Sequence, residues 1–277
     1  CGHCRLQLIQ PVWNSEADMR GYWSTLDVGQ LDDLQNEHDR RKLYALETIK
    51  GFNEKVPEGG TLLEIGCGVG GFLEKQRGRH EVYGAEWHPA FASFVRDRLG
   101  LPCEEGLLED IYPGKTFNAI VAIDVLQSQP DPGAFLQRLK KRLIGGGWLY
   151  LEIPHANDPM AAVYVLREYQ DYFYCAEHVT YWLPHQLHWF LDSVGFEANV
   201  QPMQRYGILS HFNWMLNRQP MEDEFPARAK MRAVNKAHPM AGPMNRILER
   251  MDIEYRLGLK GLWASDYLAA MGRRMEI

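Results

Sequence analysis

Residues 62–76 read LLEIGCGVGGFLEKQ, and this stretch decides the fold. The apolar run TLLEI at 61–65 predicts a buried strand, four glycines follow within six positions, and residues 70–76 predict the opening of a helix. Glycine loses more conformational freedom on folding than other residues, so this cluster is expected where a ligand comes close to the backbone. The stretch therefore predicts a strand, a tight turn and a helix, with a ligand at the turn.

Predicted strands and helices alternate along the rest of the chain. The further strands are expected at 81–86, 117–126, 146–154, 195–203 and 265–275, and the helices at 31–56, 89–100, 132–143 and 184–197. This alternation predicts an α/β fold with a doubly wound, mostly parallel sheet. In such sheets ligands bind beyond the carboxyl ends of the strands. The block from about 208 to 259 is mostly helical by pattern and too long for a simple connection, so we expect an insertion that covers the site.

Composition limits the classes of partner. The 277 residues carry 30 Lys and Arg against 36 Asp and Glu, for a net charge of −6, which disfavours a nucleic-acid partner. We find no apolar run long enough for a membrane span and no signal segment, and we expect a cytoplasmic protein without a membrane partner. Cys67, Cys103 and Cys175 are far apart in apolar surroundings, as reduced thiols would be. The sequence leaves the oligomeric state open.

Two carboxylates indicate which ligand the glycines hold. Gly66, Gly68 and Gly70 form G-x-G-x-G, but a glycine at 71 also completes the G-x-G-x-x-G pattern of dinucleotide folds. Glu64, two residues before the first glycine, would repel a pyrophosphate and attract an ammonium or sulfonium group. Glu86 lies twenty residues after the first glycine, where an acid binds ribose hydroxyls. Both acids fit S-adenosylmethionine, and Glu64 argues against NAD.

Four motifs carry a family resemblance: LLEIGCGVG, VYGAEWHP, FNAIVAIDVLQSQPDP and GGGWLYLEIP. Together and in this order, over roughly 40–200, they resemble the motifs of class I S-adenosylmethionine-dependent methyltransferases. The resemblance implies a seven-stranded Rossmann-like sheet and S-adenosylmethionine as cofactor. We expect this sheet to carry a helical N-terminal cover and a helical insertion before the last strand. The positions that it assigns to cofactor binding are Glu64, Gly66, Gly68, Gly70, Glu86, Leu107, Leu108 and Asp124.

The sequence departs from this family pattern in two places. Many relatives have Asp at the position of Leu107, so the adenine is expected to rest on apolar packing and backbone groups, with Glu109 as a substitute acid. Many relatives also read V-L-E-H-x-x-D-P where this chain has Gln127 and Ser128. A mechanism that uses the Glu-His pair is therefore in question, and a protein that binds the cofactor without catalysis remains an alternative.

The first residues, CGHCRLQLIQP, resemble the second knuckle of the zinc ribbon in a subgroup of these enzymes, notably sugar C-methyltransferases. Cys1 and Cys4 would then supply two of the four ligands of a zinc site, and only if a first pair precedes them. Arg5 stands where the subgroup has glycine. The alternative is a pair of free thiols, and we expect no metal to be bound by the chain as it stands.

The acceptor region is expected at 172–182, YFYCAEHVTYW, which resembles the Y-x-x-E-H-x-x-Y-F stretch of the same subgroup. Position by position, this implies Tyr174, Glu177, His178 and Tyr181, with His178 able to take a proton and Glu177 able to orient it. A helix cap or a core pocket is the alternative reading. His155, where relatives often have asparagine, is a further candidate on the acceptor side.

A later segment, 203–220, also resembles an acceptor-binding segment of small-molecule methyltransferases. Its polar groups are Gln204, Arg205, Tyr206 and His211, and the alternative for most of them is a packed helical lid.

These observations predict four regions: a remnant of a zinc-ribbon-like segment at 1–27, the cofactor-binding core at 28–206, a helical lid at 207–260 and the last strand of the core at 261–277. The predicted function is methyl transfer from S-adenosylmethionine to a small polar acceptor, with a sugar or nucleotide-linked sugar first and carbon or oxygen undecided. An NAD-dependent oxidoreductase and a non-catalytic S-adenosylmethionine-binding protein are the alternatives.

Overall fold

The computed structural model describes residues 7–8, 15–29, 31–175, 177–220 and 238–276. The chain forms two compact units. The first, called the core unit below, comprises Cys1–Ile153, Ala176–Val200 and Ala269–Ile277, and the second unit comprises Pro154–Cys175 and Gln201–Leu268. Pro154–Cys175 thus belongs to the second unit, whereas the sequence analysis grouped it with the core.

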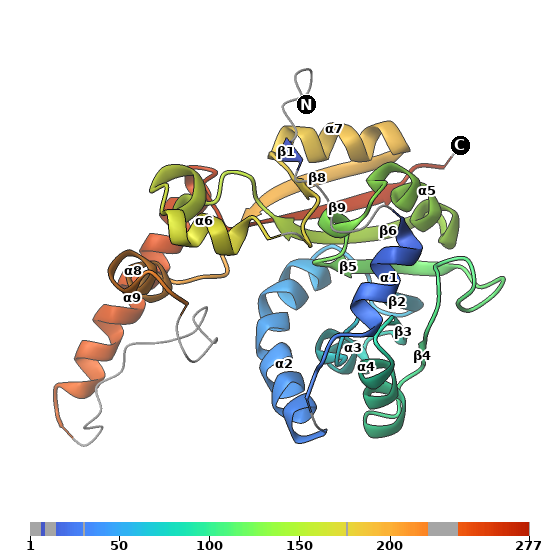
Figure 1. Ribbon diagram of the computed structural model, residues 1–277, viewed down its shortest axis with the longest axis horizontal. Helices are drawn as coiled ribbons and strands as arrows, with labels where there is room; N and C mark the ends of the chain where they lie inside the picture. Colours follow the sequence, from blue (N-terminus) through green and yellow to red (C-terminus); the bar gives the residue numbers. More distant parts are fainter. Residues whose placement is uncertain (1–6, 9–14, 30, 176, 221–237, 277) are drawn as a thin grey trace. The chain divides into compact units, whose positions relative to one another are not determined.

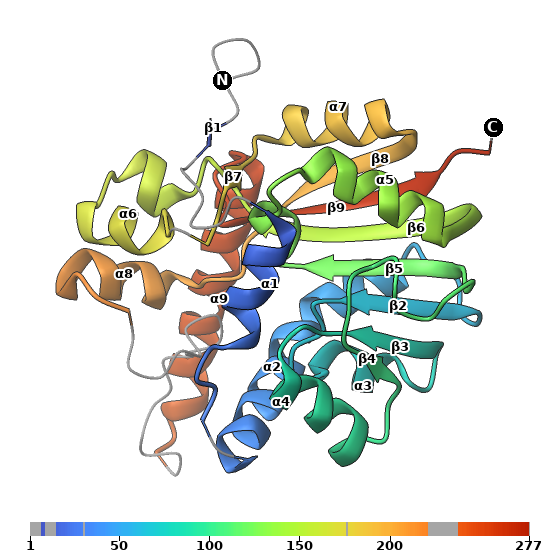
Figure 2. The same cartoon turned by 45° about the vertical axis from the view of Figure 1, so that its right-hand side comes forward.

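A seven-stranded sheet in the order β4-β3-β2-β5-β6-β9-β8 organises the core unit. Its strands are β2 (Thr61–Ile65), β3 (Glu81–Ala85), β4 (Cys103–Glu104), β5 (Phe117–Ile123), β6 (Leu143–Pro154), β8 (Phe196–Met203) and β9 (Tyr267–Arg274). Strands β3, β2, β5 and β6 are parallel to one another. The last strand, β9, enters between β6 and β8 and runs against β2, β3 and β5 (Figure 2).

The seven-stranded α/β fold expected from the sequence is therefore confirmed. The two-residue strand β4 lies in a stretch where no strand was located from sequence, because two residues give no readable alternation. A separate two-stranded antiparallel sheet joins β1 (Gln7–Leu8) to β7 (Thr180–Tyr181).

Helices of the core unit flank the sheet on both faces (Figure 1). They are α2 (Leu31–Asn53), α3 (Gly71–Gln76), α4 (Pro89–Ser93), α5 (Pro132–Arg142) and α7 (Pro184–Val194). Helix α1 (Glu16–Ser24) lies beyond the carboxyl ends of β2, β3 and β5 (Figure 2). Helix α5 begins as its sequence predicts, since Pro132 occupies the first turn and the Asp131 carboxylate accepts the N–H of Ala134 at 2.9 Å. The helix predicted at 89–100 is α4 continued by a π-helical turn, Phe94–Arg98.

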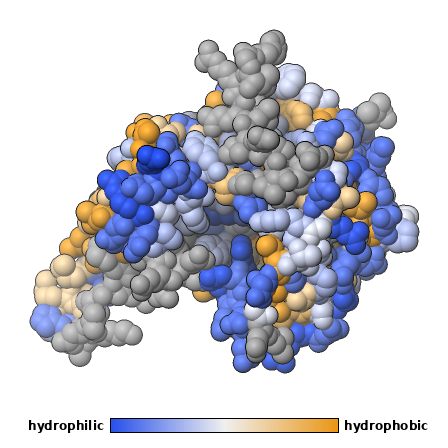
Figure 3. Space-filling view, viewed as in Figure 1, coloured by the Kyte–Doolittle hydropathy of each residue, from blue (hydrophilic) through white to orange (hydrophobic). Residues whose placement is uncertain are grey.

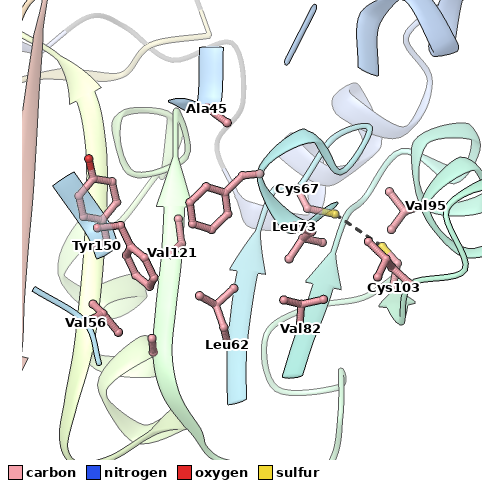
Figure 4. Close-up of a cluster of buried hydrophobic side chains, with 14 of the residues drawn as sticks. Ala45, Val56, Leu62, Cys67, Leu73, Val82, Val95, Cys103, Val121 and Tyr150 are labelled. Atoms are coloured by element: carbon pink, nitrogen blue, oxygen red, sulfur yellow. Dashed lines mark hydrogen bonds between the residues drawn. The ribbon is translucent and has the colours of Figure 1, made fainter. Parts of the chain in front are cut away.

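Apolar residues from neighbouring strands form the core beneath α2 and α3. Leu62 on β2, Val82 on β3, Val121 on β5 and Tyr150 on β6 share one face of the sheet and are 5% exposed or less (Figure 4). Glu64 follows Leu62 on the same face, because side chains two apart on a strand point the same way. Its carboxylate therefore lies at the edge of this apolar cluster, near the carboxyl ends of the strands.

The second unit contains a π-helical turn, Pro159–Val163, and the helices α6 (Arg167–Phe173), α8 (Ile208–Asn217) and α9 (Ala241–Gly261). Asp252 on α9 accepts the N–H of Ile208 at 2.9 Å and so caps α8. Apolar side chains gather at the surface of α8 and α9 (Figure 3); the exposed ones are Phe212, Leu216, Met244, Ile247, Met251, Ile253 and Leu257. Among the described residues, no helix is both long and apolar enough to cross a membrane.

Candidate functional site

The glycine turn adopts the backbone conformations that its composition predicts. Gly66, Gly68 and Gly70 have φ of +68°, +51° and +73°, a region that side chains with a Cβ rarely enter. A Cβ on Gly66 would also lie 2.7 Å from Cγ2 of Val125, at the end of β5. The turn is therefore held by its own backbone geometry and by close packing, and its N–H groups open the N-terminus of α3.

Glu86, directly after β3, is tied to that turn. One carboxylate oxygen accepts the N–H of Gly68 at 2.7 Å and the other accepts the N–H of His88 at 2.9 Å. Burial raises the pKa of Glu86, and these two N–H donors act against that rise. Each carboxylate oxygen can accept more than one hydrogen bond, so the acid can hold the turn and also bind ribose hydroxyls.

Glu64 is the acid expected to meet the cationic end of the cofactor. It is 4% exposed, and its Oε2 has no hydrogen-bond partner among the described residues. Desolvation raises its pKa well above the usual range, and electrostatic interaction with the Cys103 thiol and with the carboxyl groups of Glu86 and Glu152 adds to the rise. A buried carboxylate among acids is costly unless a positive group joins it, so Glu64 suits an ammonium or sulfonium ligand.

Glu152 belongs to the same group of acids and was not recognised from the sequence. It lies near the end of β6, is fully buried and accepts the hydroxyl of Tyr150 at 2.5 Å, while its backbone carbonyl accepts the N–H of Asp124 at 3.0 Å. The available signal was a charged residue inside the apolar strand GGWLYLEIP. Asp124 itself has φ of +58°, which marks a sharp turn at the end of β5.

The expected adenine segment is attached to the residue after Glu86. The indole N–H of Trp87 donates to the carbonyl of Gly106 at 2.7 Å, directly before Leu107 and Leu108. Leu108 is buried, and its carbonyl accepts Arg142 at 2.5 Å. The proposed substitute acid, Glu109, pairs instead with Arg138 at 3.2 Å. The structure therefore places the segment that we expect to flank the adenine beside the residue that follows Glu86.

The acceptor segment 177–181 pairs with the turn after β5. The N–H of Val179 donates to the carbonyl of Gln127 at 2.8 Å, and the Nδ1 of His178 lies 3.2 Å from the hydroxyl of Tyr181. Burial lowers the pKa of His178, while the nearby carboxylates of Asp124 and Glu177 act in the opposite direction. His178 is therefore a largely neutral imidazole beside the end of β5, as a proton acceptor requires.

The side chain of Gln127, at the position where relatives have glutamate, is fully buried. Neither its amide nitrogen nor its amide oxygen has a partner among the described residues.

The other two expected catalytic residues belong to the second unit. His155 is fully buried, and its Nδ1 lies 3.1 Å from the carbonyl of Ser265. A carbonyl only accepts, so Nδ1 carries the proton and Nε2 presents a lone pair, which has no partner among the described residues. Burial lowers the pKa of His155 to about 4. Tyr174 follows α6, and burial raises its pKa.

The polar residues at 204–211 are bound within the second unit. The Asp266 carboxylate accepts the N–H of Arg205 at 2.8 Å, the N–H of Tyr206 at 2.7 Å and the amide of Gln204 at 3.2 Å. His211 Nδ1 lies 2.6 Å from the hydroxyl of Tyr255 on α9. These contacts join the segment to Asp266 and to α9 within the second unit.

The described residues hold no group of three or more His, Cys, Asp or Glu that would bind a metal. Cys1 and Cys4 lie outside the described residues. Cys67 in the glycine turn and Cys103 on β4 are buried thiols with their sulfurs 3.7 Å apart (Figure 4).

Comparison with known proteins identifies a family for this arrangement. Residues 37–201 match the family described as Methyltransferase domain, which is more than half of the chain. A curated tRNA U34 carboxymethyltransferase from Alteromonas mediterranea is 32% identical over 112 residues, which span 34% of this chain and 32% of that protein. The match thus spans about a third of that relative's length.

Solved structures share the fold. A SAM-dependent methyltransferase from Archaeoglobus fulgidus superposes with a TM-score of 0.53 at 15% identity, covering 85% of this chain and 94% of that one. A chain from the complex of the Haloferax volcanii Trm112 methyltransferase activator gives 0.57 at 14% identity, covering 94% and 97%. At these identities the likeness concerns the fold alone.

Proposed function

We propose that this chain, which belongs to the methyltransferase domain family, transfers a methyl group from S-adenosylmethionine to a small polar acceptor, with a sugar or nucleotide-linked sugar as the first candidate. The observation that carries the proposal is the pair of acids around the glycine turn. Glu86 is bonded to Gly68, and Glu64 is a buried carboxylate with an unpartnered oxygen among the described residues. A ligand with ribose hydroxyls and a positive charge satisfies both.

The residues of the site fit this cofactor. Glu64 would attract the ammonium group, Glu86 would accept ribose hydroxyls, and Leu107 and Leu108 would flank the adenine. When bound, the cofactor would supply a methyl group activated by its sulfonium; the acceptor atom would bond to that methyl carbon in line with the C–S bond, which breaks and leaves S-adenosylhomocysteine. Alignment and exclusion of water are then the main contributions of the protein, and the burial of Glu64 and Leu108 favours a dry site.

His178 is the first candidate for the group that takes the acceptor's proton. It is held beside the hydroxyl of Tyr181, and Glu177 and Asp124 would stabilise the imidazolium once it forms. His155 is the second candidate, because its fixed tautomer leaves Nε2 as an acceptor of a hydrogen bond. Its pKa of about 4 makes His155 a weak base near neutral pH, so it is better suited to orient a hydroxyl than to hold a proton.

The sugar assignment is supported by the resemblance of residues 172–182 to the sugar C-methyltransferases. The tRNA named for the curated relative is not carried over, because that match covers a third of the chain and the net charge is −6. A zinc site formed by Cys1 and Cys4 with an upstream pair remains part of the same proposal.

Two measurements test the function. Calorimetry should detect binding of S-adenosylmethionine and of S-adenosylhomocysteine, and no heat from NAD; binding of NAD alone would refute the proposal in favour of an oxidoreductase. Radiolabelled methyl transfer should then be followed with UDP-, dTDP- and GDP-linked sugars. His178→Ala should abolish transfer while leaving cofactor affinity intact. Cofactor binding with no transfer to any acceptor class would instead identify a non-catalytic binding protein.

A further inference from the structure

Helix α1 is hydrogen-bonded to the acceptor segment, residues 177–181, through the side chain of Tyr22. The hydroxyl of Tyr22 donates to Oε1 of Glu177 at 2.5 Å, across 155 positions of sequence. Met19, 1% exposed, packs on the same helix against Val179, and Trp23 adds apolar contact. Helix α1 therefore contacts Glu177 and Val179, the residues immediately before and after His178.

The segment that follows α1 is hydrogen-bonded to His88, two residues after Glu86. The carbonyl of Leu26 lies 2.8 Å from Nε2 of His88, which must donate because a carbonyl only accepts. Nδ1 of the same ring accepts the N–H of Ala90 at 3.2 Å, which fixes the tautomer. The N–H of His88 in turn donates to Glu86. His88 therefore links Glu86, the acid proposed to bind ribose, to Leu26 in the segment after α1.

The helix lies over the ends of the strands that carry the site. Figure 2 shows α1 beyond the arrowheads of β2, β3 and β5, and Trp87, directly after Glu86, packs in the same apolar cluster as Tyr22 and Met19. The unpartnered Oε2 of Glu64 and the unpartnered amide of Gln127 are shielded from solvent by the residues packed around them in the described part of the chain. A ligand that reaches these atoms requires part of their cover to move.

We propose that α1 is a cover that opens for cofactor exchange and that Tyr22 is its latch, a positioning residue that also holds Glu177 in the acceptor segment. The proposal rests on the proposed function only in taking S-adenosylmethionine as the cofactor. It also predicts cofactor association and dissociation rates, because a Tyr22–Glu177 bond that is formed in the free protein slows both the binding and the release of the cofactor. Its loss should therefore raise both rates and leave the equilibrium affinity unchanged.

The test uses Tyr22→Phe with S-adenosylhomocysteine as the probe. Stopped-flow tryptophan fluorescence should show association and dissociation both about tenfold faster than in the wild type, as expected for loss of a hydrogen bond to an ionised group. The dissociation constant from calorimetry should stay the same. Glu177→Gln, which retains an acceptor oxygen, should give intermediate rates and serves if the first variant folds poorly.

Tyr83→Phe is the matched control, since Tyr83 also donates to a glutamate, Glu81, but at the amino end of β3. It should leave both rates unchanged. Unchanged rates in Tyr22→Phe would overturn the latch, and a weaker affinity with unchanged association would show that Tyr22 contacts the cofactor instead. Failure of the proposed function has a different signature, seen in the wild type: either it does not bind the probe, or it binds the probe but transfers no methyl group to sugar acceptors.

Discussion

The carboxylate of Glu86 accepts the backbone N–H of Gly68 at 2.7 Å, so the acid that ends β3 and the turn that ends β2 form one structure. This bond explains why the spacing of twenty residues between Gly66 and Glu86 carries information. The two strands are parallel and adjacent, and Ile65 pairs with Ala85. Their carboxyl ends therefore meet at the same edge of the sheet.

Replacing Glu86 by Gln should weaken S-adenosylmethionine binding by about ten- to a hundredfold, because hydrogen bonds to the ribose and to the turn lose their charged acceptor. Calorimetric titration measures the change. Glu81→Gln, at the exposed amino end of the same strand, should bind like the wild type. Equal affinity for all three proteins would remove Glu86 from the cofactor site.

Gly66→Ala should destabilise the protein more than Gly114→Ala. Both glycines have positive φ, +68° and +73°, so both variants share a backbone strain of about 1 kcal/mol or more. Only at Gly66 would the new Cβ also meet Val125, at 2.7 Å, whereas nothing lies within 4 Å at Gly114. Urea denaturation should resolve the difference, and only the first variant should lose cofactor affinity. Equal unfolding midpoints would mean that Val125 moves aside freely.

His155 should make stability depend on pH on the acidic side. Its pKa is about 4 in the folded protein, below the ordinary 6.5, so between these values the unfolded chain binds a proton that the folded chain does not. The contribution of His155 to the free energy of unfolding is complete above pH 6.5. It decreases by roughly 3 kcal/mol as the pH falls to about 4. His155→Asn should reduce the fall in unfolding free energy between pH 7 and 4 by about that amount, measured by denaturant titration. His188→Asn, at an exposed site, should leave the pH dependence intact.

Gln127→Met should stabilise the cofactor-free protein. The amide is fully buried with two unpartnered polar atoms among the described residues, and an apolar side chain of similar size removes their desolvation cost of about 1 to 3 kcal/mol. Thermal denaturation should show a melting temperature higher by several degrees. In the control, Gln76→Met, the equally buried amide loses a 3.0 Å bond to Asn53, so no gain is expected. A lower melting temperature for Gln127→Met would show that its amide is satisfied within the protein.

Local pattern was sufficient for most of the fold. The strands β2, β3, β5, β6, β8 and β9 lie where apolar runs and turn residues predicted them, and the glycines of the turn have the positive φ that only glycine adopts readily. These features depend on neighbours within a few residues, which the sequence displays directly. The strand β4 was not located, since two residues paired to β3 leave no periodic signal.

The sequence by itself determined the sheet, the glycine turn and the two acids that favour a cationic, ribose-bearing ligand. The tertiary structure decided which groups join them: the backbone carbonyl of Glu152 accepts the N–H of Asp124, Tyr22 is bonded to Glu177, and the tautomer of His155 is fixed by Ser265. The physical reason is separation along the chain. A strand pattern or a turn is encoded by adjacent residues, whereas the bonds of Tyr22 and His155 join positions more than a hundred residues apart and exist only once the chain has folded.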